Sequence, residues 1–195
     1  MRRLFSFFCA SLAATTIACV SEAPDTSCEV YCKQITTACA GSDAQYTFLT
    51  GSMSAIEACN AACATFPKTM ETTGNTQKCR AAQLTLVDEA KGNPAEVHTR
   101  CMEAGPFSEI CGGRVANFCR YDISVCGMTA FGSQQACESA FGSVADGLDK
   151  GVNDNGVPSL NTKACYFYHL QKATEPNGTA LHCRHTKVPS PVCTQ

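Results

Sequence analysis

The architecture of this chain follows from residues 28–39, CEVYCKQITTAC. Cys28 and Cys32 are four residues apart, and Cys39 lies seven residues beyond Cys32. Residues at these separations lie on one face of an α-helix. We therefore expect a helix that presents all three cysteines on one side, where a neighbouring element can form disulfides with them.

A second cysteine pair has the same spacing. Cys59 and Cys63 are also four residues apart. Two such helices packed antiparallel bring the outer cysteines together and the inner cysteines together. The spacing therefore predicts two nested disulfides, Cys28–Cys63 and Cys32–Cys59.

The cysteine pattern occurs twice along the chain, which indicates an internal duplication. NTQKC ending at Cys79 matches NTKAC ending at Cys165. The matched positions are Cys32 and Cys119, Cys39 and Cys126, Cys59 and Cys137, Cys79 and Cys165, Cys101 and Cys183, Cys111 and Cys193, Asn75 and Asn161, and Thr76 and Thr162. We expect two tandem helical repeats, residues 27–111 and residues 112–195.

Two mismatches between the copies support the outer disulfide. In the second copy, Cys28 is replaced by Val115 and Cys63 by Phe141. A lone thiol is a liability in an oxidising compartment, so the loss of both cysteines together indicates that Cys28 and Cys63 are bonded to each other.

The remaining cysteines are assigned by analogy and by spacing. Cys119–Cys137 repeats the inner bond of the hairpin. A third helix in each copy would be tied by Cys39–Cys79 and Cys126–Cys165, and short terminal loops would be closed by Cys101–Cys111 and Cys183–Cys193. These assignments use fourteen of the sixteen cysteines and leave Cys9 and Cys19.

Apolar residues recur every three or four positions, which predicts an all-α fold. The expected helical segments are 27–40, 53–66, 76–90 and 95–104 in the first copy, and 115–126, 133–148, 160–173 and 178–186 in the second. Ser52 or Ser54, Asn75 or Thr76, and Ser133 are expected N-caps, and Pro94 suits a first helical turn. Each repeat is therefore a disulfide-stapled helical hairpin with two further helices.

The start of the chain has the features of an export signal. Arg2 and Arg3 precede an apolar run that is too short to span a bilayer. TIAC, residues 16–19, is similar to a bacterial lipobox, which predicts cleavage before Cys19 and lipid attachment to its thiol. We expect a signal peptide over 1–18 and a lipid-anchored linker over 19–26.

Ordinary signal-peptide cleavage is the alternative. It would fall after Ala14 or after Ala23, although Pro24 disfavours the second position. Val20, rather than Asp, follows the lipobox cysteine, which favours the outer membrane over the inner membrane. The predicted location is an exported lipoprotein facing the periplasm or the cell surface, and the high cysteine content agrees with an oxidising compartment.

The charge of the chain argues against nucleic acid as a partner. Its formal net charge is −2, with 15 basic and 17 acidic residues, and no basic cluster stands out. The expected partners are a membrane, through the lipid anchor, and an envelope protein that the sequence does not identify.

Three of the four histidines, His169, His182 and His185, lie near the end of the chain. His169 is four residues after Cys165, so a disulfide there would turn it inward. His182 and His185 are three apart and would share a helical face. Three imidazoles from two helices could bind zinc, copper or a haem iron, or form a pH-sensitive cluster. We expect these histidines to be structural polar packing with no cofactor, and a metal or haem ligand site is the alternative.

The first copy carries Gln83, Arg100 and Glu103 at the positions of these histidines. All three are polar, which suggests that the positions meet in space in both halves and form a hydrogen-bonded ionic cluster in the first. No nucleophile elbow, SxxK motif or Cys-x-x-Cys pair is present, so we expect no enzymatic activity.

The motifs above resemble a group of cysteine-rich, lipid-anchored myxobacterial proteins of unknown function. That group combines Cys-x3-Cys helices with Cys-Arg-x-Tyr-His and His-Cys-x-His-Ala-Gly-Pro. The matching residues here are Cys79, Arg80, Cys101 and Ala104 to Pro106 in the first copy, and Cys165, Tyr168, His169, His182, Cys183 and His185 in the second. The resemblance implies an envelope protein with a structural or interaction role; a metal- or haem-binding module is the alternative.

Overall fold

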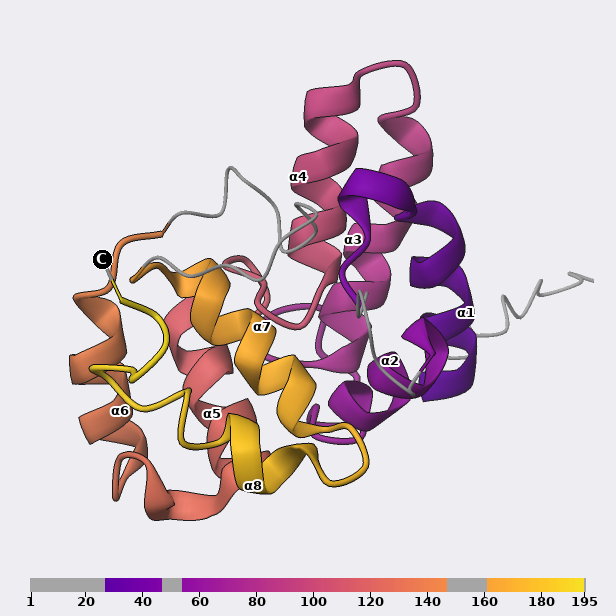
Figure 1. Ribbon diagram of the computed structural model, residues 1–195. Helices are drawn as coiled ribbons and strands as arrows, with labels where there is room; N and C mark the ends of the chain where they lie inside the picture. The colour runs from indigo at the N-terminus through magenta and orange to yellow at the C-terminus, as the bar shows by residue number, and fades with distance from the viewer. Residues whose placement is uncertain (1–26, 47–53, 147–160, 195) are drawn as a thin grey trace, which may run out of the picture.

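The computed structural model describes residues 27–46, 54–146 and 161–194, and these ranges are helical (Figure 1). The helices are α1 (Cys28–Ala38), η1 (Gly41–Asp43), α2 (Ala55–Cys63), α3 (Gln77–Glu89), α4 (Pro94–Ala104), α5 (Arg114–Cys126), η2 (Gly127–Thr129), α6 (Gln134–Gly142), α7 (Lys163–Ala173) and α8 (Gly178–His182). The described residues contain no strand, only an isolated bridge between Ala145 and Thr162. The all-α prediction is confirmed for this part of the chain.

The predicted signal peptide (1–18), lipidation site (Cys19) and linker (19–26) lie outside the described residues. Among the helices that are described, none combines the length and the apolar character that a bilayer span requires.

Capping residues set the helix starts as the sequence predicts. Ser54 and Glu57 form a reciprocal capping box at the start of α2. The Thr76 hydroxyl accepts a hydrogen bond from the Cys79 amide at 3.0 Å, and Pro94 occupies the first turn of α4. Ser133 caps α6. These contacts satisfy amides that have no partner inside the helix.

The helices pair in chain order. α1 packs on α2 and α3 on α4, and α5 packs on α6 and α7 on α8. The pairs are joined through α1 with α3 in the first half and through α5 with α7 in the second. Figure 1 shows α1 to α4 gathered on one side of the molecule and α5 to α8 on the other.

Three predicted disulfides are present in the structure. Cys28–Cys63 and Cys32–Cys59 close the α1–α2 hairpin, and Cys119–Cys137 joins α5 to α6. The helical spacing of the cysteines was sufficient to predict these bonds, because each one joins two helices that are adjacent in the chain.

The other four predicted pairings are wrong. The structure has Cys39–Cys101 and Cys79–Cys111 in place of Cys39–Cys79 and Cys101–Cys111. It has Cys126–Cys183 and Cys165–Cys193 in place of Cys126–Cys165 and Cys183–Cys193. The physical reason is tertiary: α4 packs back against α1, which brings Cys101 to Cys39 and leaves Cys79 to bond the segment after α4.

Equivalent cysteines are paired in the two halves. Under the sequence match, Cys32–Cys59, Cys39–Cys101 and Cys79–Cys111 correspond to Cys119–Cys137, Cys126–Cys183 and Cys165–Cys193. The tandem repeat stays a prediction, and this matched bonding is the observation that supports it.

An aromatic cluster fills the second half and reaches the first. Phe141, which replaces Cys63, stacks on Phe118 with ring centroids 3.8 Å apart. Phe107, from the segment after α4, stacks on Phe167 of α7 at 3.9 Å. Buried apolar contact therefore takes the place of the outer disulfide and also joins the halves.

Candidate metal site

Three histidine side chains converge at the end of the second half. Nδ1 of His169, in α7, lies 3.0 Å from Nδ1 of His182, the last residue of α8, and 3.4 Å from Nδ1 of His185. One ligand atom from each residue lies within 4.8 Å of the other two. The structure thus brings together the three histidines that the sequence singled out.

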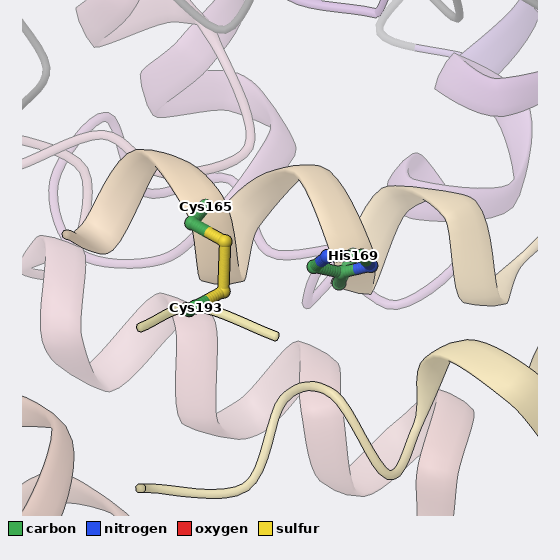
Figure 2. Close-up of side chains that lie close together, drawn as sticks. All are labelled: Cys165, His169 and Cys193. Atoms are coloured by element: carbon green, nitrogen blue, oxygen red, sulfur yellow. A yellow bond between two sulfur atoms is a disulfide. The ribbon is translucent and has the colours of Figure 1, made fainter. Parts of the chain in front are cut away.

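The local fold explains why His169 points inward. Every residue of α7 is buried, and His169 itself is 5 % exposed. The Cys165–Cys193 disulfide holds the preceding turn of α7, and Figure 2 shows His169 beside that bond. The helix therefore has no solvent face to which this imidazole could turn.

His182 and His185 lie beside His169, but the backbone that places them there differs from the single helix predicted. They do not share a helical face, because α8 ends at His182. His185 follows in a turn in which its amide donates to the His182 carbonyl at 2.9 Å. Cys183, between them, is bonded to Cys126 of α5, which fixes this turn against the rest of the second half.

Burial and mutual repulsion keep the cluster neutral at pH 7. Desolvation, with smaller effects of His185 and His182, lowers the pKa of His169 from 6.5 to about 4. Burial also lowers the pKa of His182 and of His185. Neutral imidazoles have the free lone pairs that metal coordination requires.

One of the two ring nitrogens of His169 has no hydrogen-bond partner among the described residues. A neutral imidazole has one donor and one acceptor nitrogen. Nδ1 faces the other two histidines, and Nε2 is buried with no hydrogen-bond partner in the described part of the chain. This unpaired Nε2 costs about 1–3 kcal/mol, and an ion bound at Nδ1 would leave it without a partner as well.

The nitrogen spacing fits a tetrahedral metal ion. Zinc–nitrogen bonds of 2.0–2.1 Å place neighbouring ligand nitrogens about 3.3–3.4 Å apart in a tetrahedron. Nδ1 of His169 lies 3.0 Å from Nδ1 of His182 and 3.4 Å from Nδ1 of His185. Two of the three separations are therefore close to those of a tetrahedral site, and the ligand atoms of His182 and His185 lie within 4.8 Å of each other. Three imidazole ligands would leave a fourth position open.

An ion pair with a buried lysine borders the site. Lys172 Nζ lies 2.6 Å from Glu175 Oε1, and both groups influence the pKa of His182. Lys172 also lies over the Tyr168 ring, which packs edge-on against His169. The Glu175 carboxylate, which acts on His182, is thus engaged with a lysine.

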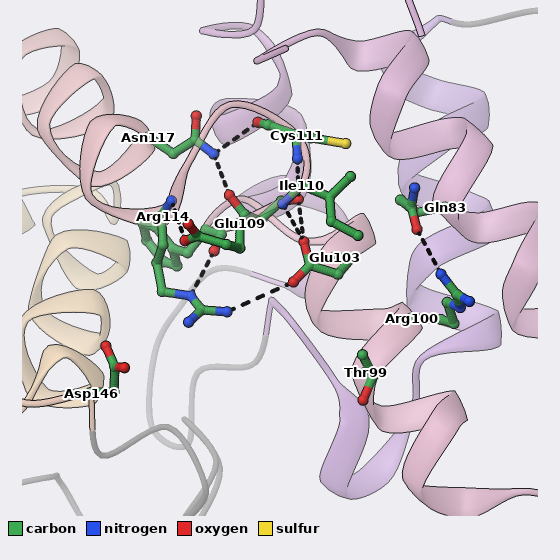
Figure 3. A network of polar contacts seen from close by, with 12 residues as sticks. Gln83, Thr99, Arg100, Glu103, Glu109, Ile110, Cys111, Arg114, Asn117 and Asp146 are labelled. Carbon is green, nitrogen blue, oxygen red and sulfur yellow. Dashed lines mark hydrogen bonds and ion pairs between the residues drawn. The ribbon is translucent and has the colours of Figure 1, made fainter. Parts of the chain in front are cut away.

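The corresponding first-half positions meet only in part. Arg100 Nη1 donates to Gln83 Oε1 at 3.5 Å. Glu103 turns away to accept hydrogen bonds from the Ser108 hydroxyl at 2.8 Å and the Ile110 amide at 2.7 Å (Figure 3). The first half contains polar contacts here, as expected, but they are two separate groups rather than one cluster.

The sequence patterns did not indicate two charged residues that are fully buried, Arg80 and Asp122. Arg80 is fully buried and donates to the carbonyls of Gly105, Thr76 and Pro106. Asp122 is fully buried in α5. The motif Cys79-Arg80 was a signal for the first; nothing in the sequence marked the second.

Comparison with protein-family models, with curated proteins and with solved structures found no match to this chain. The chain is therefore defined by its own features: a disulfide-rich, all-helical structure with a three-histidine cluster. The resemblance to the myxobacterial group stays a prediction.

Proposed function

We propose that this chain is an exported, non-enzymatic helical lipoprotein of the bacterial envelope that binds a transition metal through His169, His182 and His185. Seven disulfides support the first part, because bonds of this kind persist in oxidising, non-cytoplasmic environments. The outer membrane and an interaction with another envelope protein follow from the lipobox and from the resemblance.

The convergence of three neutral, largely buried imidazoles carries the metal assignment. Zinc and copper are among the ions that imidazole ligands suit. Haem fits less well, since two axial ligands lie on opposite faces of the macrocycle. Nδ1 atoms 3.0 Å apart leave no room for a porphyrin between them.

The metal role is tested on the purified, oxidised protein by equilibrium dialysis and metal analysis. We expect one zinc or copper ion per chain, lost in the triple variant His169→Gln, His182→Ala and His185→Ala. His98→Gln is the matched control, because His98 bonds Asp43 at 2.9 Å in the first half and takes no part in the cluster. Absence of stoichiometric metal, or metal retained by the triple variant, would overturn the proposal.

Anchoring is tested by membrane fractionation of the producing cell. Cys19→Ala should release the protein from membranes. Cys9→Ala is the control, because Cys9 lies within the predicted signal peptide and would be removed with it. Unchanged membrane association of the Cys19 variant would contradict the lipid anchor.

A further inference from the structure

We propose that Cys165, Cys193 and His169 form a second metal-ligand set, which becomes available when the Cys165–Cys193 disulfide is reduced. This site goes beyond the three-histidine cluster and shares only His169 with it. Its ligand atoms would be two thiolate sulfurs and one imidazole nitrogen, a donor set that favours zinc.

The three side chains are already assembled. The two sulfurs and a ring nitrogen of His169 lie within 4.8 Å of one another, and all three residues are buried. Cys165 and His169 are one turn apart in α7, and Cys193 comes from the C-terminal segment that lies against this helix (Figure 2). No large rearrangement of the backbone is needed to bring them to one ion.

His169 has an unused nitrogen for this purpose. Nδ1 faces His182 and His185, whereas Nε2 has no hydrogen-bond partner among the described residues. A buried imidazole nitrogen without a partner is stabilised by any ligand that pairs with it.

The chemistry balances with a dithiol reductant as co-reactant. The reductant transfers two electrons and two protons, is itself oxidised to a disulfide, and leaves Cys165 and Cys193 as two thiols. A divalent zinc ion then displaces both protons and binds the two thiolates and the imidazole nitrogen. Zinc–sulfur bonds of about 2.3 Å require the sulfurs to separate to roughly 3.8 Å in a tetrahedron.

Contacts other than the disulfide hold the segment that carries Cys193. The Ser190 hydroxyl accepts from the Cys193 amide at 3.1 Å, and the Ser190 amide donates to the Tyr166 hydroxyl at 3.3 Å. Cys193 therefore stays near α7 after the sulfur–sulfur bond is broken.

The first half supplies an internal control. Cys79–Cys111 is the equivalent disulfide, and Gln83 stands where His169 stands. A Gln amide is a poor zinc ligand. Because metal binding to the reduced form favours that form by mass action, zinc should promote reduction of Cys165–Cys193 and not of Cys79–Cys111.

The test uses the full chain carrying His182→Ala and His185→Ala, which removes the three-histidine site. The protein is titrated with a phosphine reductant in the presence of Co²⁺ or Zn²⁺, and free thiols are mapped by alkylation and mass spectrometry. We expect thiolate-to-cobalt charge-transfer absorption in the near ultraviolet and a several-fold rise in the reduced fraction of Cys165 and Cys193 with zinc. Far-ultraviolet circular dichroism of the same samples reports whether the helices remain.

Adding His169→Gln should abolish both signals while the helix content is unchanged. The inference is overturned if Cys165 and Cys193 become alkylated without any charge-transfer band, if zinc promotes both equivalent disulfides equally, or if the His169→Gln variant keeps the band. Because the other two histidines are absent throughout, these outcomes do not depend on whether the oxidised protein binds metal.

Discussion

Asp122 accepts a 2.6 Å hydrogen bond from the Thr186 hydroxyl, which ties α5 to the residue directly after His185. Asp122 is fully buried, and its Oδ2 has no hydrogen-bond partner within the described structure. The equivalent first-half residue is Ile35, which is 1 % exposed. The second half thus buries a carboxyl group where the first half buries an aliphatic side chain.

Asp122→Asn should stabilise the protein at neutral pH. Burial raises the pKa of Asp122 from 3.8 to about 6. The folded state therefore holds this proton more tightly than the unfolded state, and stability falls as the pH rises through that window. At pH 7 the free energy of unfolding of the asparagine variant should exceed that of the wild type by up to about 3 kcal/mol, because each unit of pKa shift corresponds to about 1.36 kcal/mol. Below pH 3.8 the difference should vanish.

Urea unfolding at pH 4 and pH 7 measures this difference. Asp88→Asn is the control, because Asp88 is exposed in an ion pair with Lys91. The prediction is contradicted if the Asp122→Asn variant is less stable than the wild type at pH 7, because the ionised carboxylate would then stabilise the folded state.

His169→Gln should reduce the acid sensitivity of the metal-free protein. The folded-state pKa of His169 is about 4, below the ordinary 6.5. Its contribution to stability is present above pH 6.5 and is lost as the pH falls towards 4, since the unfolded chain then binds the proton more readily. Glutamine, the residue at the equivalent position 83, does not titrate.

Thermal melts of the two proteins between pH 7 and pH 4 test this expectation. The wild type should lose more stability over this range than the His169→Gln variant. Equal losses in both proteins would contradict the assignment of His169 as a buried neutral imidazole.

Arg80→Lys should destabilise the first half by on the order of 2–3 kcal/mol, the cost of leaving buried carbonyls without donors. Arg80 donates to Gly105 and Pro106 and stacks over Phe66, with its guanidinium carbon 3.9 Å from the ring centroid. A lysine ammonium group cannot donate in both of these directions and stack on the ring at the same time, as the planar guanidinium does. Chemical unfolding measures the loss, and Arg100→Lys, at a partly exposed arginine, should cost less than 1 kcal/mol.

Removal of the outer disulfide by Cys28→Ala with Cys63→Ala should cost about 2–4 kcal/mol. This bond closes a 35-residue separation and has no counterpart in the second half. Cys28→Val with Cys63→Phe, which copies Val115 and Phe141, should recover part of the loss through apolar contact. Calorimetric melting of the wild type and the two double variants measures these differences. If the alanine pair leaves the melting temperature unchanged, the Cys28–Cys63 disulfide does not stabilise the fold.

Short-range features of this chain were predictable from local spacing. The capped starts of α2, α3 and α6 and the nested bonds of α1 and α2 depend on residues within one helix or between adjacent helices. The cysteine partners of α4 were not predictable, because sequence spacing does not show that this helix returns to α1. The predicted helix over 178–186 ends at His182 for a similar reason: the Cys126–Cys183 bond directs the chain into a turn.

The amino-acid sequence by itself determined the helices, their caps, the hairpin disulfides and the identity of the three histidines, since each depends on periodicity or residue chemistry. Only the tertiary structure decided the four long-range disulfides, the burial of Arg80 and Asp122, and the approach of His169 to His182 within 3.0 Å. Packing of helices that are distant in sequence fixes these features, and that packing depends on the summed contacts of many side chains rather than on any local pattern.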